Sequence, residues 1–328
     1  MSLTEEKRRR NLIYLLVLCP VLIAAGVFLG DGWREPSTLF HADRAGILEI
    51  RLWRVALGAL VGGSLAVSGA VLQTVLRNPL AEPYVLGLSA GAGLGTALCI
   101  VLGGLAVSAA LLPLSGFLGA ALSLLIVYQL ARTARGTTPH TLILAGVVWG
   151  AITGSVLMFL VTQSSTEGLH AILWWLLGDL QVYDVHLVKV VAVINLLAVL
   201  ALSWYARSLN ALLLGDEGAG HVGLHPERSK VIVLSLAAVL AASAVSVSGI
   251  ISFVGLIAPH AARGLVGSNH QRLLPASALG GAAFLVWADG IGRGLLFPVE
   301  IPVGVLTALI GGPFFLILLR KRQREIWS

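Results

Sequence analysis

The amino-acid sequence predicts an all-α, polytopic membrane protein with about ten transmembrane helices, because the chain holds about ten apolar runs of about 20 residues each. Hydrophobic residues make up 57% of the 328 residues and charged residues only 12%, whereas soluble domains carry about 25% charge. The basic residues lie at the ends of the apolar runs and not along one face. The formal net charge of +6 therefore indicates membrane orientation and not nucleic-acid binding. Residues 1–328 are interpreted as a single membrane domain.

The N-terminal half is expected to contain five spans. Residues 1–10 form a charged tail before the first apolar run, residues 11–30. A signal peptide is the poorer interpretation of this run, because it exceeds the usual apolar region of about 7–15 residues and lacks a small-residue cleavage site. A polar loop at 31–49 follows. The next four spans are predicted at residues 51–73, 84–103, 108–130 and 140–162.

The C-terminal half is expected to contain five more spans after a short interfacial segment. That segment, LHAILWWLLGDL, is too short to cross a bilayer, and its Trp174 and Trp175 suit a membrane interface. The seventh and eighth spans are separated only by a tight turn at Ser248 and Gly249, so one fused helix is the alternative there. The five spans are predicted at residues 186–205, 231–247, 251–266, 273–292 and 303–319.

The distribution of basic residues predicts the orientation of these spans. Ten spans place both termini on one side. With that topology, 16 of the 22 Lys and Arg residues fall on the side of the termini. Because cytoplasmic loops carry the excess of basic residues, both termini are predicted to be cytoplasmic.

A polar elbow followed by a small-residue helix is predicted at residues 77–95, RNPLAEPYVLGLSAGAGLG. Two prolines forbid a continuous helix here, so one helix should stop near Gln73 and the next should start near Tyr84. The glycines let the second helix approach its neighbours closely. Arg77 adds to the polar character of the elbow, which is expected to face the cytoplasm. The elbow residues are Asn78, Pro79, Glu82 and Pro83, and the packing glycines are Gly87, Gly91, Gly93 and Gly95.

The chain has no sequence signal for nucleotide binding, catalysis or a metal site. The glycine-rich run at 91–95 neither follows a soluble strand nor ends in Gly-Lys-Ser/Thr, so it lacks the context of a phosphate loop. If ATP drives this protein, another polypeptide must bind it. Polar residues inside the spans are few, and Asp289 stands four residues before Arg293, where the two can pair on one helix face. We interpret that pair as structural and not as a proton relay.

Two groups of residues are candidates for contacts with other proteins. The polar stretch at 207–230 includes LGDEGAGHVGLHPERSK, in which Asp216 and Glu217 could start a short helix. It is either a solvated connection or a docking element for a cytoplasmic partner. On the predicted outer side, Arg51, Arg54 and Arg293 lie at span ends. They either anchor the spans by snorkelling or recognise acidic residues of an external protein, and the residues alone leave both interpretations open.

Four segments in order resemble the FecCD-type permeases, the membrane subunits of ATP-driven importers for iron chelates, haem and cobalamin. The first starts at RLWR and continues through the elbow to residue 95, and the second is LLLGDEGAGHVGL. The third is GIISFVGLIAPHAARGLVGSNHQRLLP and the fourth is ADGIGRGLLFPVEIPVGVLTALIGGPFFLILL. Together they cover much of the chain.

The resemblance implies a homodimer with the substrate path on its two-fold axis, in the cytoplasmic (inner) membrane of a bacterium or archaeon. Two cytoplasmic ATPase subunits, which bind ATP and Mg²⁺, would dock below, and a periplasmic or lipid-anchored substrate-binding protein would dock above. The chain itself would be no enzyme and would bind no cofactor. Arg51, Arg54 and Arg293 would meet acidic residues of the binding protein. The residues expected to contact the ATPase are Leu214, Gly215, Asp216, Glu217, Ala219, Val222, Gly223 and Leu224.

The resemblance leaves the cargo and one local feature open. A ferric siderophore is the leading cargo, with cobalamin or haem as the alternative. A stand-alone, ion-coupled secondary transporter is the alternative from a different class, and a purely structural membrane anchor is a third interpretation. The chain departs from the usual coupling pattern at Gly218, Gly220 and His221, so the regularity of a helix at this position is an open question.

Overall fold

The computed structural model describes residues 3–30, 45–108, 110–133, 136–182 and 184–327, and these are almost entirely helical. Most of the predicted polar loop at 31–49 lies outside the described residues. The helices of the first half are α1 (Leu3–Ala25), η1 (Gly26–Phe28), α2 (Ala45–Val75), η5 (Pro83–Leu86), α3 (Leu88–Val101), α4 (Gly104–Val107), α5 (Leu111–Ala131) and α6 (Pro139–Gln163). Those of the second half are α7 (Thr166–Leu177), α8 (Val185–Trp204), α9 (Ala206–Leu212), α10 (Gly215–His221), α11 (Pro226–Ser248), α12 (Val254–Val266), α13 (His270–Leu295) and α14 (Val303–Trp327).

Ten of these helices correspond to the ten predicted spans, which confirms the predicted fold class. Among the described residues, eight helices are long and apolar enough to cross a membrane by length and composition: α1, α2, α5, α6, α8, α11, α13 and α14. The other two, α3 and α12, are apolar but have only 14 and 13 residues. Both are shorter than their predicted spans, because the 3-10 helix η5 and the turn at Gly87 precede α3, and a non-helical stretch precedes α12. The segment before α8 forms the separate 12-residue helix α7, as predicted.

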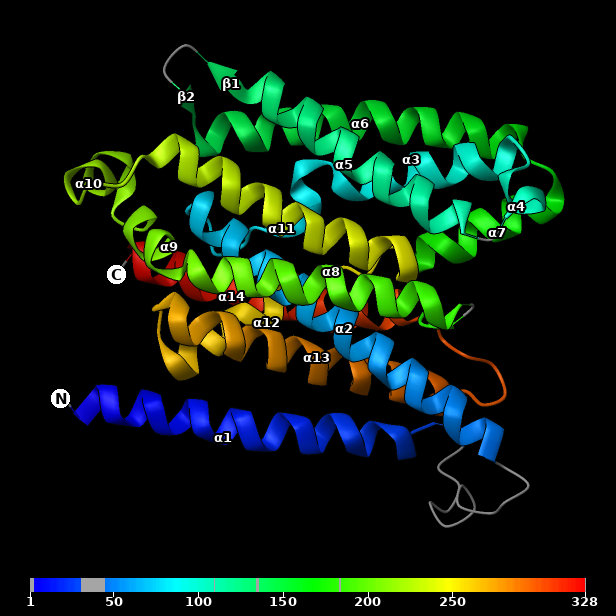
Figure 1. Ribbon diagram of the computed structural model, residues 1–328, viewed down its shortest axis with the longest axis horizontal. Coiled ribbons are helices and arrows are strands. Elements are labelled where there is room, and N and C mark those ends of the chain that lie inside the picture. Colours follow the sequence, from blue (N-terminus) through cyan, green and yellow to red (C-terminus); the bar gives the residue numbers. More distant parts are fainter. Residues whose placement is uncertain (1–2, 31–44, 109, 134–135, 183, 328) are drawn as a thin grey trace.

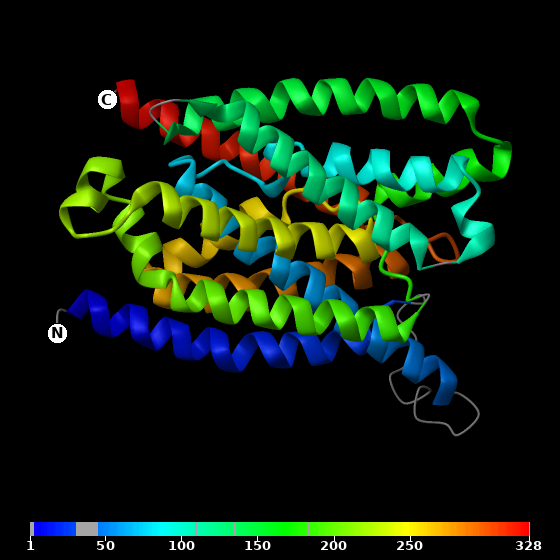
Figure 2. The same ribbon diagram turned by 45° about the horizontal axis from the view of Figure 1, so that its top comes forward.

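Helix α2 runs through the centre of the bundle and packs against α11, α12 and α13 (Figures 1 and 2). Small residues allow these crossings. A Cβ atom on Gly62 would lie 2.3 Å from the carbonyl oxygen of Gly281 in α13, and one on Gly69 would lie 1.8 Å from that of Gly255 in α12. Because such separations are far inside van der Waals contact, only glycine fits at these two positions of α2.

The outer helices expose apolar side chains over most of their length. In the apolar 18-residue stretch of α2, 78% of the residues are buried, whereas in the corresponding stretches of α5, α6 and α14 only 22% are buried. On α6, the side chains of Leu144, Ile152 and Phe159 are each more than half exposed. Continuous apolar surface of this kind is stable in lipid and not in water, so the chain is a multi-pass membrane protein.

Helices α11 and α12 are separate, and the alternative of one fused helix is wrong. Helix α11 ends at Ser248 because Gly249 adopts a positive φ of 66°. A Cβ atom there would lie 2.0 Å from the carbonyl oxygen of Trp175, so the chain turns against the end of α7. The amide N–H of Ile250 donates to that same carbonyl oxygen, at 3.4 Å. Helix α12 then starts at Val254.

Both described ends of the chain lie at one end of the bundle, together with α10 and the two-stranded hairpin of β1 (Arg132–Thr133) and β2 (Gly136–Thr137) (Figure 1). We call this the terminal end. The opposite end, which carries α7 and the turn between α13 and α14, is the distal end. The shared side of the two termini agrees with the ten-span topology.

Candidate functional site

The short helix α10 projects from the bundle at its terminal end, whereas α9 packs against α2 and α13 (Figure 1). Asp216 and Glu217 lie in the first turn of α10, where their negative charge stabilises the helix dipole. At the other end, the amide N–H of Leu224 donates to the carbonyl oxygen of Ala219 at 3.0 Å, and Gly223 adopts a positive φ of 81°. These contacts close the last turn, so a regular seven-residue helix forms in spite of its internal glycines.

Apolar side chains at the two ends of α10 point away from the bundle. Leu214 is 63% exposed and Val222 is 62% exposed. Ala219 is fully buried and Leu224 packs against the main core, so they hold the helix to the protein. This exposed apolar pair makes α10 a candidate for contact with another protein. Of the other residues predicted for the ATPase contact, Gly215 is half-buried, whereas Asp216, Glu217 and Gly223 are exposed.

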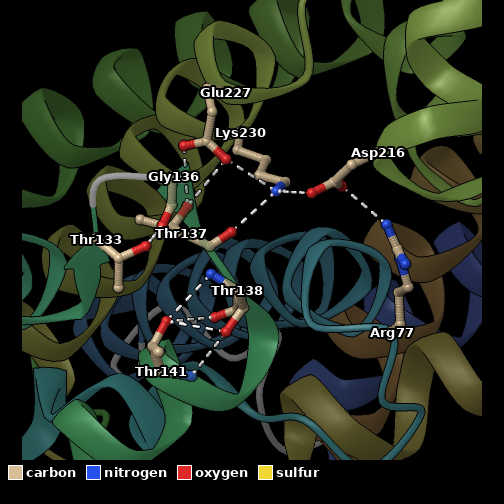
Figure 3. A network of polar contacts seen from close by, with 9 residues as sticks. All are labelled: Arg77, Thr133, Gly136, Thr137, Thr138, Thr141, Asp216, Glu227 and Lys230. Carbon is tan, nitrogen blue, oxygen red and sulfur yellow. Dashed lines mark hydrogen bonds and ion pairs between the residues drawn. The ribbon is translucent and has the colours of Figure 1, made fainter.

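A buried lysine joins α10 to the rest of the terminal end (Figure 3). The Lys230 side chain in α11 is only 4% exposed. Its ammonium group donates to Oδ2 of Asp216 at 2.7 Å, to Oε1 of Glu227 at 3.0 Å and to the carbonyl oxygen of Thr137 at 3.1 Å. Three acceptors satisfy the three donors of an ammonium group, which is what allows this charge to be buried.

The other carboxylate oxygen of Asp216, Oδ1, forms an ion pair with Arg77. Nη2 of Arg77 lies 2.8 Å from Oδ1 of Asp216, and Arg77, just after the end of α2, adopts a left-handed backbone with φ of 47°. One carboxylate of α10 therefore contacts two other elements, through Arg77 just after α2 and Lys230 in α11 (Figure 3). A displacement of α10 would act on the end of α2 and on the start of α11 at the same time.

The contacts of Lys230, Asp216, Arg77, Glu227 and Thr137 form one polar network. Its residues in the β1–β2 hairpin also fix the start of α6. Oγ1 of Thr137 donates to Oε2 of Glu227 at 3.1 Å. The next residue, Thr138, caps α6: its side chain accepts from the amide N–H of Thr141 at 3.2 Å, and the Thr141 hydroxyl accepts from the amide N–H of Thr138 at 3.1 Å. This reciprocal arrangement is a capping box. The network thus reaches α2, α6, α10 and α11 (Figure 3).

The elbow between α2 and α3 differs from the sequence prediction at Glu82. Arg77 is exposed and Asn78 caps the turn through its Oδ1, which accepts from the amide N–H of Leu80 at 3.0 Å. The carboxylate of Glu82, in contrast, points back into the bundle and accepts from the amide N–H of Phe253. Phe253 is the N-cap of α12, and amide groups at a helix N-terminus lack intrahelical partners. The prediction that Glu82 lies on a wet cytoplasmic edge is therefore wrong.

Two further residues of this region also contact α12 and the connection before it. The Tyr84 hydroxyl donates to the carbonyl oxygen of Ile251 at 3.0 Å and accepts from its amide N–H at 3.1 Å. Pro83 starts η5 and its ring lies against Gly255, whereas Pro79 is half-buried in the turn.

The glycines that follow bring α3 against α5 and α6. Gly87 adopts a positive φ of 74° at the start of α3. A Cβ atom on Gly91 would lie 2.5 Å from the carbonyl oxygen of Gly119 in α5, and one on Gly95 would lie 2.2 Å from that of Ser115. Gly93 faces the other way, where the nearest atom to an added Cβ would belong to Leu157 of α6, at 3.3 Å.

An arginine and carboxylate cluster lies at the distal end. Arg54 of α2 donates through Nε and Nη2 to Asp289 of α13, with Nη2 2.8 Å from Oδ1. Nε of Arg293 lies 3.0 Å from Oδ2 of the same carboxylate, which confirms the predicted pair. Nη2 of Arg54 also lies 3.0 Å from Oε2 of Glu300. Nη1 of Arg51 donates to the carbonyl oxygen of Val27 at 3.2 Å.

The three arginines are largely turned into the bundle. The side chain of Arg293 is 4% exposed and that of Arg54 is 13% exposed, and Arg51 is 8% exposed. Arg54 has a partner with an exposed side chain, since Glu300 is 42% exposed.

Comparisons with known proteins agree on one family. The chain matches the FecCD transport family over residues 16–321. The chain belongs to this family. It is 46% identical to a cobalamin import system permease protein of Halobacterium salinarum over 84% of this chain and 73% of the relative. It is 38% identical to an Fe(3+)-citrate import system permease protein of Bacillus subtilis over 99% of this chain and 100% of the relative.

A solved structure described as an inward-facing metal-chelate type ABC transporter has the same fold. It superposes with a TM-score of 0.85 at 32% identity, over 96% of this chain and 99% of that one. The chain is therefore a FecCD permease with the fold of an ABC transporter membrane subunit.

Sequence reasoning missed several residues of this FecCD permease that bear on its site. Lys230 and Glu227 lie three residues apart at the start of a span, which is a weak signal for an ion pair. No local pattern indicated that Thr137 or Arg77 would join them. The role of Glu300 was also missed, because its contact with Arg54 spans 246 residues of sequence.

Proposed function

We propose that this chain is the permease subunit of an ABC importer that moves a ferric siderophore across the cytoplasmic membrane. The cargo arrives on a substrate-binding protein, and ATP and Mg²⁺ bind to a separate ATPase. The observation that carries this proposal is α10, which exposes Leu214 and Val222 and is tied into the bundle through Asp216 and Lys230. Helix α10 can therefore contact the ATPase through its exposed apolar side chains and transmit a displacement to the bundle through its ion pairs.

We propose that the terminal end faces the cytoplasm. The supporting observation is the excess of basic residues on the side of the termini, 16 of 22, since cytoplasmic segments carry most Lys and Arg. The ATPase then binds at α10, and the distal end faces the binding protein. Arg54, assisted by Arg51 and Arg293, receives acidic residues of that protein.

In this proposal the working unit is a homodimer with the cargo path on its two-fold axis. ATP binding and hydrolysis change the distance between the two ATPases, and each α10 follows its ATPase. The contacts of Asp216 with Arg77 and Lys230 transmit this movement to α2 and α11. The spans then rock so that the path opens alternately to each side of the membrane. Such alternating access by rigid-body rocking is common in transporters built from helical repeats.

The relatives are named for different cargoes. One relative is named for Fe(3+)-citrate and another for cobalamin. We take a ferric chelate as the leading cargo, with cobalamin or haem as the alternative.

Reconstitution in proteoliposomes tests the proposal. The chain is purified together with its ATPase and its substrate-binding protein, and uptake of a radioactive ferric siderophore is measured. We expect uptake only with ATP, the ATPase and the binding protein, and inhibition by vanadate. The control is the chain alone under a proton or sodium gradient. Cargo accumulation in that control would overturn the proposal in favour of a secondary transporter.

A further inference from the structure

Arg54 holds two carboxylates that differ strongly in exposure. Asp289 is 5% exposed and accepts from both Nε and Nη2 of Arg54. Glu300 is 42% exposed and accepts from Nη2 alone, at 3.0 Å. A two-bond pair in a largely buried site is strong and geometrically fixed, whereas a single exposed ion pair contributes little net stability. Arg54 therefore has one permanent partner and one that can be exchanged.

The backbone around Glu300 is fixed, so that only its side chain needs to move. The amide N–H of Val299 donates to the carbonyl oxygen of Leu296 at 3.0 Å, which closes the preceding turn. The amide N–H of Ile301 donates to the carbonyl oxygen of Gly292 at 3.1 Å. Leu296 and Val299 are 58% and 65% exposed at the tip of this turn. A change of rotamer is thus enough to withdraw the carboxylate from Arg54.

We propose that Glu300 is an intrachain substitute for an acidic residue of the substrate-binding protein. In the free permease it occupies the accessible edge of the Arg54 guanidinium, and docking displaces it with a carboxylate of the partner while Asp289 stays in place. The exposed apolar turn beside Glu300 then lies against the partner. This inference rests on the proposed function. The chain itself weakens docking, because the carboxylate of the partner must compete with Glu300 for Nη2 of Arg54.

The test is the affinity of the intact transporter for its binding protein. The permease and ATPase complex is placed in lipid nanodiscs, and the Kd of its substrate-binding protein is measured for three forms: wild type, Glu300→Gln and Glu167→Gln. Glu167 is the matched control, since it is exposed at the distal end, in the first turn of α7, and its change removes the same charge. Glu300→Gln keeps the shape of the side chain but removes the competing anion.

We expect Glu300→Gln to bind the partner about two- to fivefold more tightly than Glu167→Gln, the range that an exposed ion pair can supply. The difference should shrink at high salt. If the wild type binds its partner and Glu300→Gln binds no more tightly than Glu167→Gln, this inference is overturned while the proposed function stands. If the wild type binds no partner at all, the proposed docking falls and the inference falls with it.

Discussion

Single carboxylates connect distant parts of this protein at both ends of the bundle. At the terminal end Asp216 contacts Arg77 and Lys230, and at the distal end Asp289 contacts Arg54 and Arg293. In each case one partner comes from α2 or the residue pair just after it. The other is Lys230 of α11 at the terminal end and Arg293, four residues further along α13, at the distal end. Carboxylates suit this role because two oxygens can accept from two cations at once.

The lysine of the terminal network yields a prediction at this scale. Replacing Lys230 with Met removes the donor shared by Asp216, Glu227 and Thr137. We expect a loss of about 1–2 kcal/mol in the free energy of unfolding, the lower part of the range for an unsatisfied polar site because both carboxylates stay near water. We also expect ATP hydrolysis to continue while uptake falls, since α10 is no longer tied to α11.

The matched control is Arg228→Met, which removes a basic residue from the same helical turn at an exposed position. Stability is measured by thermal unfolding of the purified permease and coupling by the ratio of cargo transported to ATP hydrolysed. Equal ratios for the Lys230→Met and Arg228→Met variants would show that Lys230 takes no part in coupling.

At the scale of elements, helix packing depends on glycines whose positions the sequence indicates but whose partners it does not. The run at 87–95 predicted close packing, and the structure shows α3 against α5 at Gly91 and Gly95. The glycines of α2 and α13 form a second close crossing, at Gly62 and Gly281. In lipid, such contacts replace the hydrophobic effect as the main source of association between helices.

Replacing Gly95 with Ala tests the crossing of α3 and α5. The added methyl group would lie 2.2 Å from the carbonyl oxygen of Ser115, so the two backbones must separate. We expect a loss of about 1–3 kcal/mol in the free energy of unfolding, which is typical of overpacking. The control is Gly150→Ala in α6, where no atom beyond the local backbone of the helix lies within 4 Å of the added carbon. Unfolding is followed by titration with a denaturing detergent, and equal effects of the two changes would contradict the crossing.

At the scale of the whole molecule, the bundle has one end with both termini and one end without them (Figure 1). The basic residues predict which end is cytoplasmic, and cysteine labelling in cells tests it. In a chain with Cys19 and Cys99 replaced by Ala, new cysteines are placed at Thr133 and at Glu167, which are exposed at opposite ends. A maleimide that cannot cross the membrane should label position 167 in spheroplasts, and position 133 only after permeabilisation. The reverse pattern would mean that the orientation is inverted.

Local patterns in the sequence predicted the membrane class, about ten spans and the pair of Asp289 with Arg293. They favoured a turn at Ser248 and Gly249 over a fused helix, and indicated that a short helix could start at Asp216 and Glu217 without settling its regularity. Each of these depends on residues close together in the chain, through hydrophobic run length, helix-breaking residues or i, i+4 spacing. The misplaced residue was Glu82, whose sequence neighbours, Arg77 and two prolines, suggested a surface turn.

The sequence by itself thus determined that this chain is a lipid-embedded helical bundle with a polar element between the sixth and seventh spans. Only the tertiary structure decided which charges meet: Glu82 with the start of α12, Arg54 with Asp289 and Glu300, and Lys230 with Asp216 and the hairpin. The physical reason is that local sequence sets whether a segment is helical and apolar. The partner of a buried charge is set by which helices cross, and that is a property of the whole bundle.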